Sequence, residues 1–320
     1  MVGRVLASGA DRTGGAAMSR VAIAVCTYRR ESVLETLQSL MEIILPKGVE
    51  TDIMVIDNDV TPSARDRVEA FAETAPRPVR YVHAPAGNIS VARNAALNAS
   101  DARFLAFIDD DEVASRTWLS ALMAARDHSG VDIVLGPVAA VYPDAAPDWM
   151  REENLHATLP VRARGEIRTG YSGNVLIDRS CKALDGLRFD PALGETGGED
   201  TIFFAVAHDA RARIGFAADA LVTEAVLPSR LSLKWLSARR LRSGRTHARL
   251  LLQIERRTRW GALLTAVAKA GYCAFAMALW LPVTRRRNVA ALRFLFHAGV
   301  CLELLQSDAP SEPALDEVRP

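Results

Sequence analysis

Residues 104–112 read FLAFIDDDE, a run of five apolar residues that passes directly into four acids. An unbroken apolar run of this length, with aromatic and β-branched members, is typical of a strand buried on both faces of a parallel sheet. Four similar runs lie along the first half of the chain, at 21–25, 52–56, 79–83 and 131–141. The sequence therefore predicts an α/β fold whose buried strands form one open sheet.

The segments between these strands have apolar residues at helical spacing. The predicted helices cover 31–41, 62–75, 90–97 and 118–126. Ser90 is the expected cap of the third helix. A proline-rich connection after Tyr142 leads to a further strand at 174–178 and to a helix that begins at Thr201. This alternation predicts a mixed, mostly parallel sheet that is flanked by helices.

The composition is that of an ordinary globular protein. The 320 residues are 49% hydrophobic and 24% charged, which excludes disorder for most of the chain and allows a sizeable core. The net charge of +1 hides an asymmetry, because residues 227–300 hold fifteen Lys and Arg but only Glu255 as an acid. We expect a disordered N-terminus over 1–19 with Met18 as a candidate start, a sheet domain over 20–227, a basic helical region over 228–307 and a disordered tail over 308–320.

Polar residues follow the strands at their carboxyl ends, where ligands bind in open α/β sheets. They are Thr27, Tyr28 and Arg29 after the first strand, Asp57 after the second, and Asp109, Asp110 and Asp111 after the fourth. Three adjacent carboxylates repel one another, and Mg²⁺ or Mn²⁺ relieves that repulsion while leaving positions for phosphate oxygens. The pattern favours metal-assisted phosphate binding; the alternative is a solvated acidic turn with Asp109 as a helix cap.

A second acidic pair, Glu199 and Asp200, follows two glycines and precedes the helix expected from Thr201. The helix dipole favours an ionised carboxylate at this position, and the ionised form is the one that acts as a general base. The alternative is that Asp200 is only an N-cap. Arg93, one turn inside the third helix, either reaches a nucleotide or is a surface arginine. Tyr28 and Asp57, taken singly, are equally compatible with turns.

Six segments carry a family resemblance by their order and spacing. They are VAIAVCTYRR, VIDND, GNISVARNAAL, FIDDDE, TGYSGN and GGEDTIFF. Together they resemble an inverting glycosyltransferase of family 2 with the GT-A fold, and they are most similar to the bacterial glucosyltransferases of succinoglycan-type exopolysaccharide assembly. The resemblance covers residues 20–250.

The resemblance implies roles for individual residues. The nucleotide-sugar would be held by Thr27, Tyr28, Arg29, Asp57, Arg93, Asp109 and Asp110, and a Mn²⁺ or Mg²⁺ ion by Asp111 and Asp109. Asp200, within the Glu199–Asp200 pair, would deprotonate the acceptor hydroxyl, so that the anomeric configuration inverts. Asp110 stands where the family often has a small residue, and of the three aspartates we favour Asp111 as the metal ligand.

The resemblance also implies UDP-glucose as the donor. We expect the loops around Trp149 and Asn174 to help select the acceptor. Arg240 and Arg242 either contact the leaving diphosphate or are simply membrane-facing or surface charges.

The C-terminal region alternates basic and apolar residues. Residues 260–282 are long enough to cross a bilayer, but Lys269 lies near their centre and both flanks are positive. The positive-inside rule disfavours moving either flank across the membrane. We therefore predict a helical hairpin with 289–305 that lies in an anionic membrane interface, on the cytoplasmic face of a bacterial inner membrane. A spanning helix and ordinary packed helices are the alternatives.

A membrane location suits an acceptor saccharide that is carried on a lipid. No zinc-finger, RNP or helix-turn-helix pattern accompanies the basic residues, so we do not expect nucleic acid as a partner. Two other functions use similar residues. One is a different metal-dependent nucleotide-processing enzyme, which the absence of a glycine-rich loop or DxD after the first strand disfavours. The other is a non-catalytic assembly subunit with a degenerate transferase domain.

Overall fold

The computed structural model describes residues 19–306. The disordered termini predicted from the sequence, with Met18, lie outside the described residues, except that Ser19 already belongs to the first strand.

Seven strands form the main sheet, in the order β11-β6-β10-β4-β1-β2-β3. Their bounds are β1 Ser19–Thr27, β2 Val49–Asp57, β3 Val79–His83, β4 Phe104–Asp109, β6 Ile133–Leu135, β10 Asn174–Asp178 and β11 Ile214–Phe216. Only β10 runs antiparallel to its neighbours, β4 and β6. The predicted mixed, mostly parallel sheet is confirmed.

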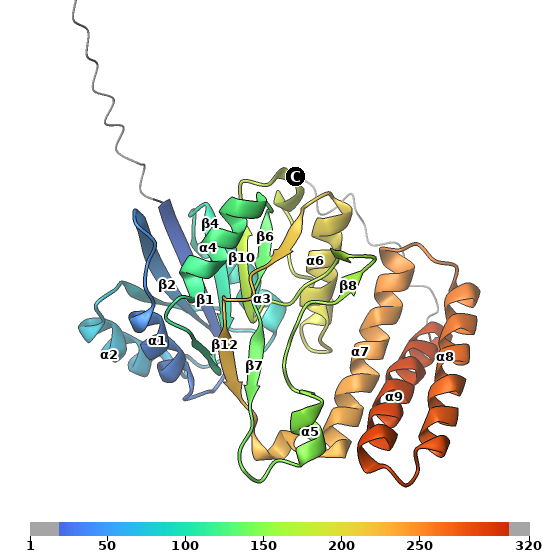
Figure 1. Cartoon of the computed structure of the whole chain (residues 1–320). Coiled ribbons are helices and arrows are strands. Elements are labelled where there is room, and N and C mark those ends of the chain that lie inside the picture. The colour runs from blue at the N-terminus through green and yellow to red at the C-terminus, as the bar shows by residue number, and fades with distance from the viewer. Residues whose placement is uncertain (1–18, 307–320) are drawn as a thin grey trace, which may run out of the picture.

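Helices cover both faces of this sheet (Figure 1). Their bounds are α1 Val33–Glu42, α2 Arg65–Thr74 and α4 Trp118–Ser129 on one face, and α3 Ile89–Ala99 and α6 Glu199–Asp209 on the other. Alternate residues of β1 enter the two cores, with Ile23 and Val25 on the α1 side and Ala24 on the α3 side. The small side chains toward α3 let that helix pack close to the strand.

The strand predicted over 131–141 is divided in two by Gly136 and Pro137. The first part is β6, and the second is β7 Val138–Val141, which joins β5 Glu112–Ala114 and β12 Val222–Ala225 in a separate sheet. Pro137 has no N–H to donate, and a Cβ at Gly136 would lie 2.4 Å from the carbonyl oxygen of Ala220. The chain therefore leaves the main sheet at this point.

Two helix starts also differ from the prediction. The side chain of Asn88, rather than that of Ser90, caps α3, by accepting from the backbone N–H groups of Ser90 and Val91. Helix α6 begins at Glu199, two residues before Thr201, because Gly198 takes the left-handed conformation as its N-cap. The connection from β7 to β10 contains α5 Asp148–Glu152 and the hairpin of β8 Arg162–Ala163 and β9 Glu166–Ile167.

Three long helices follow the sheet domain as a layer of their own (Figure 1). They are α7 Leu233–Gln253, α8 Arg259–Leu279 and α9 Thr284–Gln306. Helix α9 packs against both α7 and α8, and α8 lies at the outside. Helices α7 and α9 approach most closely at two glycines, since a Cβ at Gly244 would lie 2.0 Å from the carbonyl oxygen of Phe296 and a Cβ at Gly299 would lie 2.1 Å from that of Leu241.

We expect Gly244→Ala to destabilise the protein by about 1–3 kcal/mol, because the added methyl group forces α7 and α9 apart. Gly271→Ala in α8 is the matched control: nothing lies within 4 Å of a Cβ there, so this change should raise stability by up to about 1 kcal/mol. Urea unfolding followed by circular dichroism measures both. Equal changes in the free energy of unfolding at the two positions would show that the contact at Gly244 does not determine how closely α7 and α9 pack.

Candidate active site

The carboxyl ends of three strands meet at one edge of the sheet. Thr27 is paired with Asp57 across β1 and β2, and Cys26 is paired with Asp109 across β1 and β4. Asn174, the first residue of the antiparallel strand β10, reaches the same edge because it lies opposite Ile108. The polar residues that follow the strands in the sequence are therefore brought together in space.

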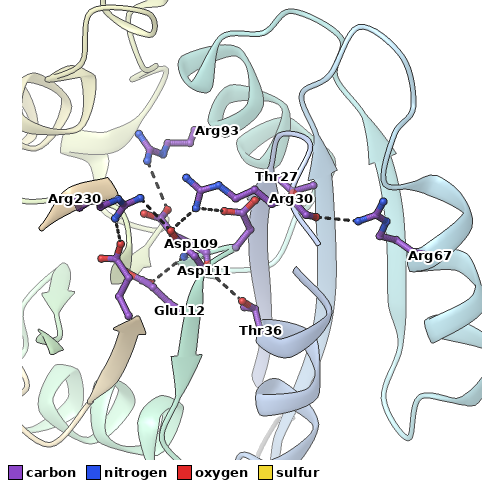
Figure 2. Close-up of polar contacts among 11 residues, drawn as sticks. Thr27, Arg30, Thr36, Arg67, Arg93, Asp109, Asp111, Glu112 and Arg230 are labelled. Carbon is purple, nitrogen blue, oxygen red and sulfur yellow. Dashed lines mark hydrogen bonds and ion pairs between the residues drawn. The ribbon is translucent and has the colours of Figure 1, made fainter. Parts of the chain in front are cut away.

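The three aspartates after β4 have different partners, and Figure 2 shows two of them, Asp109 and Asp111, among the surrounding arginines. The carboxylate of Asp110 lies against the end of β1. It accepts from Thr27 Oγ1 at 2.7 Å, and its Oδ1 is 3.2 Å from Nη1 of Arg30. Its burial raises its pKa to about 6, although Arg30 opposes this shift. The carboxylate of Asp111 contacts the guanidinium groups of Arg30 and Arg230. Asp109 is the most open of the three, with 42% of its side chain exposed.

Arg93 connects this triplet to the acidic pair of α6. Its side chain is 8% exposed, contacts Glu199 through Nη1, and lies 3.8 Å from an oxygen of Asp109 through Nη2. The guanidinium carbon also lies 5.7 Å from the centre of the Phe189 ring. Helix α3 thus directs Arg93 inward, which excludes the surface-arginine alternative. One buried cation separates two groups of carboxylates.

Glu199 and Asp200 stand at the start of α6 with different surroundings. Glu199 is 6% exposed, and its Oε2 atom is buried without a hydrogen-bond partner. Asp200 is partly exposed and accepts from the backbone N–H of Thr201 at 2.6 Å. Burial and then the Glu199 carboxylate raise the pKa of Asp200, whereas Arg93 lowers it. Burial and the Glu199 charge thus oppose the effect of the helix dipole at Asp200, and its role as the base stays a prediction; a raised pKa makes the carboxylate a stronger base once it is ionised.

Four charged residues that sequence reasoning did not single out complete the edge of the sheet. They are Arg30, Glu112, Glu224 and Arg230. Arg230 forms an ion pair with Glu224 of β12 and also contacts Asp111, which is 119 positions earlier in the sequence. Figure 2 shows Arg230 beside Asp111. Glu112 accepts from the backbone N–H of Asp109 at 3.0 Å, and burial followed by the charge of Asp109 raises its pKa well above the ordinary value.

The TGYSGN segment lies directly against these carboxylates. A Cβ at Gly173 would lie 2.6 Å from Glu112 Oε1 and 3.1 Å from Asp109 Oδ2. Only a glycine allows the segment to run this close. The next residue, Asn174, is fully buried: its amide accepts from Trp118 Nε1 and donates to the carbonyls of Pro137 and Ala220. The prediction that Asn174 contacts an acceptor is corrected, because its polar atoms already bind the protein interior.

Asp57 also faces inward. It is 0% exposed, and its carboxylate accepts from the N–H groups of Asp59 and Ala64 and from the hydroxyl of Tyr81. In this structure it orders the loop after β2 rather than presenting its oxygens to a ligand, which corrects its assignment as a direct nucleotide contact. By contrast, Tyr28 is 45% exposed. The neighbouring Arg29 stacks on Tyr28 and forms an ion pair with Asp59.

Arg240 and Arg242 lie on opposite faces of α7, as residues two positions apart on a helix must. Arg242 lies beside the loop that precedes Glu199. A Cβ added to Gly197 in that loop would be 3.5 Å from Cδ of Arg242. Arg240 is close enough to Arg293 of α9 for that charge, after burial, to lower its pKa. That Arg240 contacts the leaving diphosphate stays a prediction, beside the alternative of a membrane-facing or surface charge. Trp149 is half-buried among Tyr142, Trp235 and neighbouring apolar residues.

The edge of the sheet offers oxygen ligands of the kind that a hard divalent cation uses. Asp109 is partly open and Asp111 is one-fifth exposed, at 21%. Within residues 19–306, no three His, Cys, Asp or Glu side chains converge as a metal-binding group. One or two carboxylates suffice for Mg²⁺ or Mn²⁺ when phosphate oxygens supply other positions, so the residues present fit a cation that is shared with a bound diphosphate.

Comparisons with known proteins add to this geometry. A family model described as glycosyl transferase family 2 matches residues 22–183. The chain is 48% identical to the succinoglycan biosynthesis protein ExoM of Rhizobium meliloti over 285 residues, which cover 88% of this chain and 92% of that protein.

Two solved structures share the fold. One is the mannosyltransferase PcManGT of Pyrobaculum calidifontis in complex with GDP-Man and Mn²⁺, with 18% identity, a TM-score of 0.62, and 90% of this chain and 87% of that chain covered. The other is Staphylococcus aureus TarS 1–349 in complex with UDP, with 19% identity, a TM-score of 0.51, and 88% and 90% covered.

Proposed function

Since this chain belongs to glycosyl transferase family 2, we propose that it transfers a sugar from a nucleoside diphosphate donor to an acceptor hydroxyl with inversion at the anomeric carbon. The observation that carries the proposal is the Arg93 bridge. It holds the Glu199–Asp200 pair on one side of a buried guanidinium and Asp109 on the other. A base and a diphosphate site on either side of one sugar is what an in-line displacement requires.

In the proposed reaction, Asp200 accepts the proton of the acceptor hydroxyl. The acceptor oxygen forms a bond to the anomeric carbon as the bond from that carbon to the diphosphate oxygen breaks, and the electron pair leaves with the nucleoside diphosphate. Burial in the first turn of α6 supports Asp200 as the base, because it raises the pKa of the carboxyl. The charge of Glu199 raises the pKa of this carboxyl and that of Arg93 lowers it, so both neighbours set its affinity for the proton.

Asp109 and Asp111 are the side chains that would hold a divalent cation. Bound there, the cation would neutralise charge on the departing diphosphate. Arg30 and Arg230 already neutralise Asp111, so they keep the carboxylate ordered and are placed to contact diphosphate oxygens. The solved relatives bound to GDP-Man with Mn²⁺ and to UDP support a nucleotide-sugar donor and a divalent ion. We favour UDP-glucose from the family resemblance.

We further propose a biological setting: bacterial exopolysaccharide assembly at the cytoplasmic face of the inner membrane, with a lipid-linked saccharide as acceptor. The similarity to a succinoglycan biosynthesis protein supports this setting. Two helices, Arg259–Leu279 and Thr284–Gln306, are by length and composition long and apolar enough to cross a membrane. We retain the division into a sheet domain over 20–227 and a basic helical region over 228–307 as part of the proposal.

Titration calorimetry with UDP, GDP and dTDP, with and without Mn²⁺, tests the donor site. We expect one nucleotide to bind, and to bind more tightly with the metal. Binding of none of them would favour the non-catalytic assembly subunit instead.

Asp111→Asn should remove most of the metal-dependent gain in nucleotide affinity, by about tenfold or more, because it takes away one ligand charge. The same calorimetry measures this loss. Asp66→Asn, an exposed position in α2, is the matched control and should bind as the wild type does. If Asp111→Asn keeps the full effect of Mn²⁺, then Asp111 does not hold the cation.

A further inference from the structure

Helix α8 presents a continuous apolar stripe to its surroundings. Its members are Trp260, Leu264, Val267, Tyr272, Phe275 and Leu279, which are between 54% and 74% exposed. Their spacing of three to five residues places them on one side of the helix along its whole length. The buried residues of α8, Ala262, Ala266 and Cys273, lie on the opposite side, against the rest of the bundle. An exposed apolar surface of this extent marks an interaction site.

The only charged residue inside α8 is not on this stripe. Lys269 is three positions after Ala266 and four before Cys273, so it lies away from the stripe, and it is exposed at the side of the helix. Its charge, added to the effect of burial, lowers the pKa values of His297 in α9 and His247 in α7. The cost of placing a lysine among lipid chains, which the sequence raises as a difficulty, therefore does not arise for a helix that lies flat with the stripe downward.

A groove of about 270 Å³ opens beside the stripe, between α8, α9 and the end of α5. Tyr272 belongs to both the stripe and the groove, and Trp280, Arg286 and Arg293 line the rest. Arg286 stacks on Trp280, with its guanidinium carbon 4.1 Å from the ring centre. Among the described residues, no carboxylate pairs with Arg286 or Arg293; Glu153 at the rim is engaged by Arg285. Two arginines without counter-ions beside an apolar surface are suited to a phosphate group.

We propose that the α8–α9 hairpin lies in the plane of an anionic bilayer, with the α8 stripe among the acyl chains and the phosphate of a lipid headgroup in the Arg286–Arg293 groove. This inference rests on the proposed membrane setting and assigns the surface and the lipid chemistry that serve it. The other end of α8 is also positively charged, because it carries Arg256, Arg257 and Arg259. Both ends of a helix that lies flat would therefore meet the anionic headgroups. The layered arrangement in Figure 1, with α8 outermost, leaves the stripe free to do so.

Flotation with phosphatidylcholine vesicles, with and without phosphatidylglycerol, tests the stripe. Phe275→Glu should weaken the partitioning of the full chain roughly tenfold or more on both vesicles, because a charge replaces an aromatic side chain that the proposal places among the acyl chains. Ile44→Glu is the matched control, since it makes the same kind of change at an exposed apolar residue beyond α1 and should leave flotation unchanged. Equal losses for the two variants would overturn the assignment of the stripe. Retention of the wild-type chain in membranes after alkaline carbonate treatment would overturn the in-plane arrangement in favour of a spanning one.

The groove is tested by Arg286→Gln with Arg293→Gln on the vesicles that contain phosphatidylglycerol, where we expect roughly a tenfold loss. Arg116→Gln with Arg211→Gln removes the same net charge from exposed positions elsewhere and should lose much less. Equal losses would mean that only net charge matters, and the groove assignment would fail. Nucleotide titration of every variant separates the proposals: vesicle binding without nucleotide binding would refute the transferase site alone, and the reverse would refute the membrane surface alone.

Discussion

Asp200→Asn is expected to lower the rate of sugar transfer by about 10²–10⁴-fold while leaving nucleotide binding unchanged. The amide has the shape of the carboxylate and keeps an oxygen that can accept from the backbone N–H of Thr201, so the start of α6 should be preserved. What it loses is the ability to take the proton of the acceptor hydroxyl. The measurement is transfer of labelled sugar from the donor to a lipid extract, beside calorimetry with the nucleotide.

Glu195→Gln is the matched control for this prediction. Glu195 lies in the same loop and is exposed, so its removal changes the local charge by the same amount without touching the base. We expect it to transfer sugar at close to the wild-type rate. Transfer by Asp200→Asn at the wild-type rate would show that another group takes the proton. Loss of nucleotide binding as well would show that Asp200 serves the donor site instead.

Arg93→Met is expected to destabilise the fold by about 3–5 kcal/mol, because it leaves Glu199 buried without the one cation that pairs with it among residues 19–306. Glu199 already has one buried oxygen without a hydrogen-bond partner, so the rest of the site cannot compensate. Methionine retains much of the arginine volume and can still pack on Phe189. Urea unfolding followed by circular dichroism gives the change in the free energy of unfolding.

The double variant Arg93→Met with Glu199→Gln separates charge from packing. If the uncompensated carboxylate causes the loss, a neutral amide at position 199 should restore most of the stability. A double variant as unstable as Arg93→Met alone would assign the role of Arg93 to its contact with Phe189 instead. Neither outcome depends on an assay of sugar transfer, so this test does not depend on the identity of the donor.

The sequence predicted the frame of the site well, because its signals are local. An apolar run such as FLAFI is stable only in the protein interior, as a buried strand. The parallel pairing of β1 and β4 then brings the residues that follow them to the same edge of the sheet. The acidic pair at the start of α6 was located for the same reason. Both features can be predicted from the spacing of apolar residues along the chain and from the point where that spacing ends.

The details of the site depend on backbone turns and distant contacts that no local pattern reports. Arg29, at a φ of 56°, takes the left-handed conformation, and the next residue, Arg30, reaches Asp110 and Asp111. The sequence pattern after the first strand indicates Arg29 rather than Arg30. Arg230 reaches Asp111 only because β12 and the turn after it return the chain to the edge of the sheet. Asn174 looked like a ligand because its internal partners are far away in the sequence.

The antiparallel strand β10 has a consequence for how the chain is made. It separates β4 from β6, and β6 pairs otherwise only with β11, which is synthesised later still. Until residue 178 has left the ribosome, a growing chain therefore has a four-stranded sheet with β4 as an open edge and α4 without a partner strand. Such edges are templates for aggregation. The nascent chain therefore exposes this edge during the interval after β4 has been made and before β10 can pair with it.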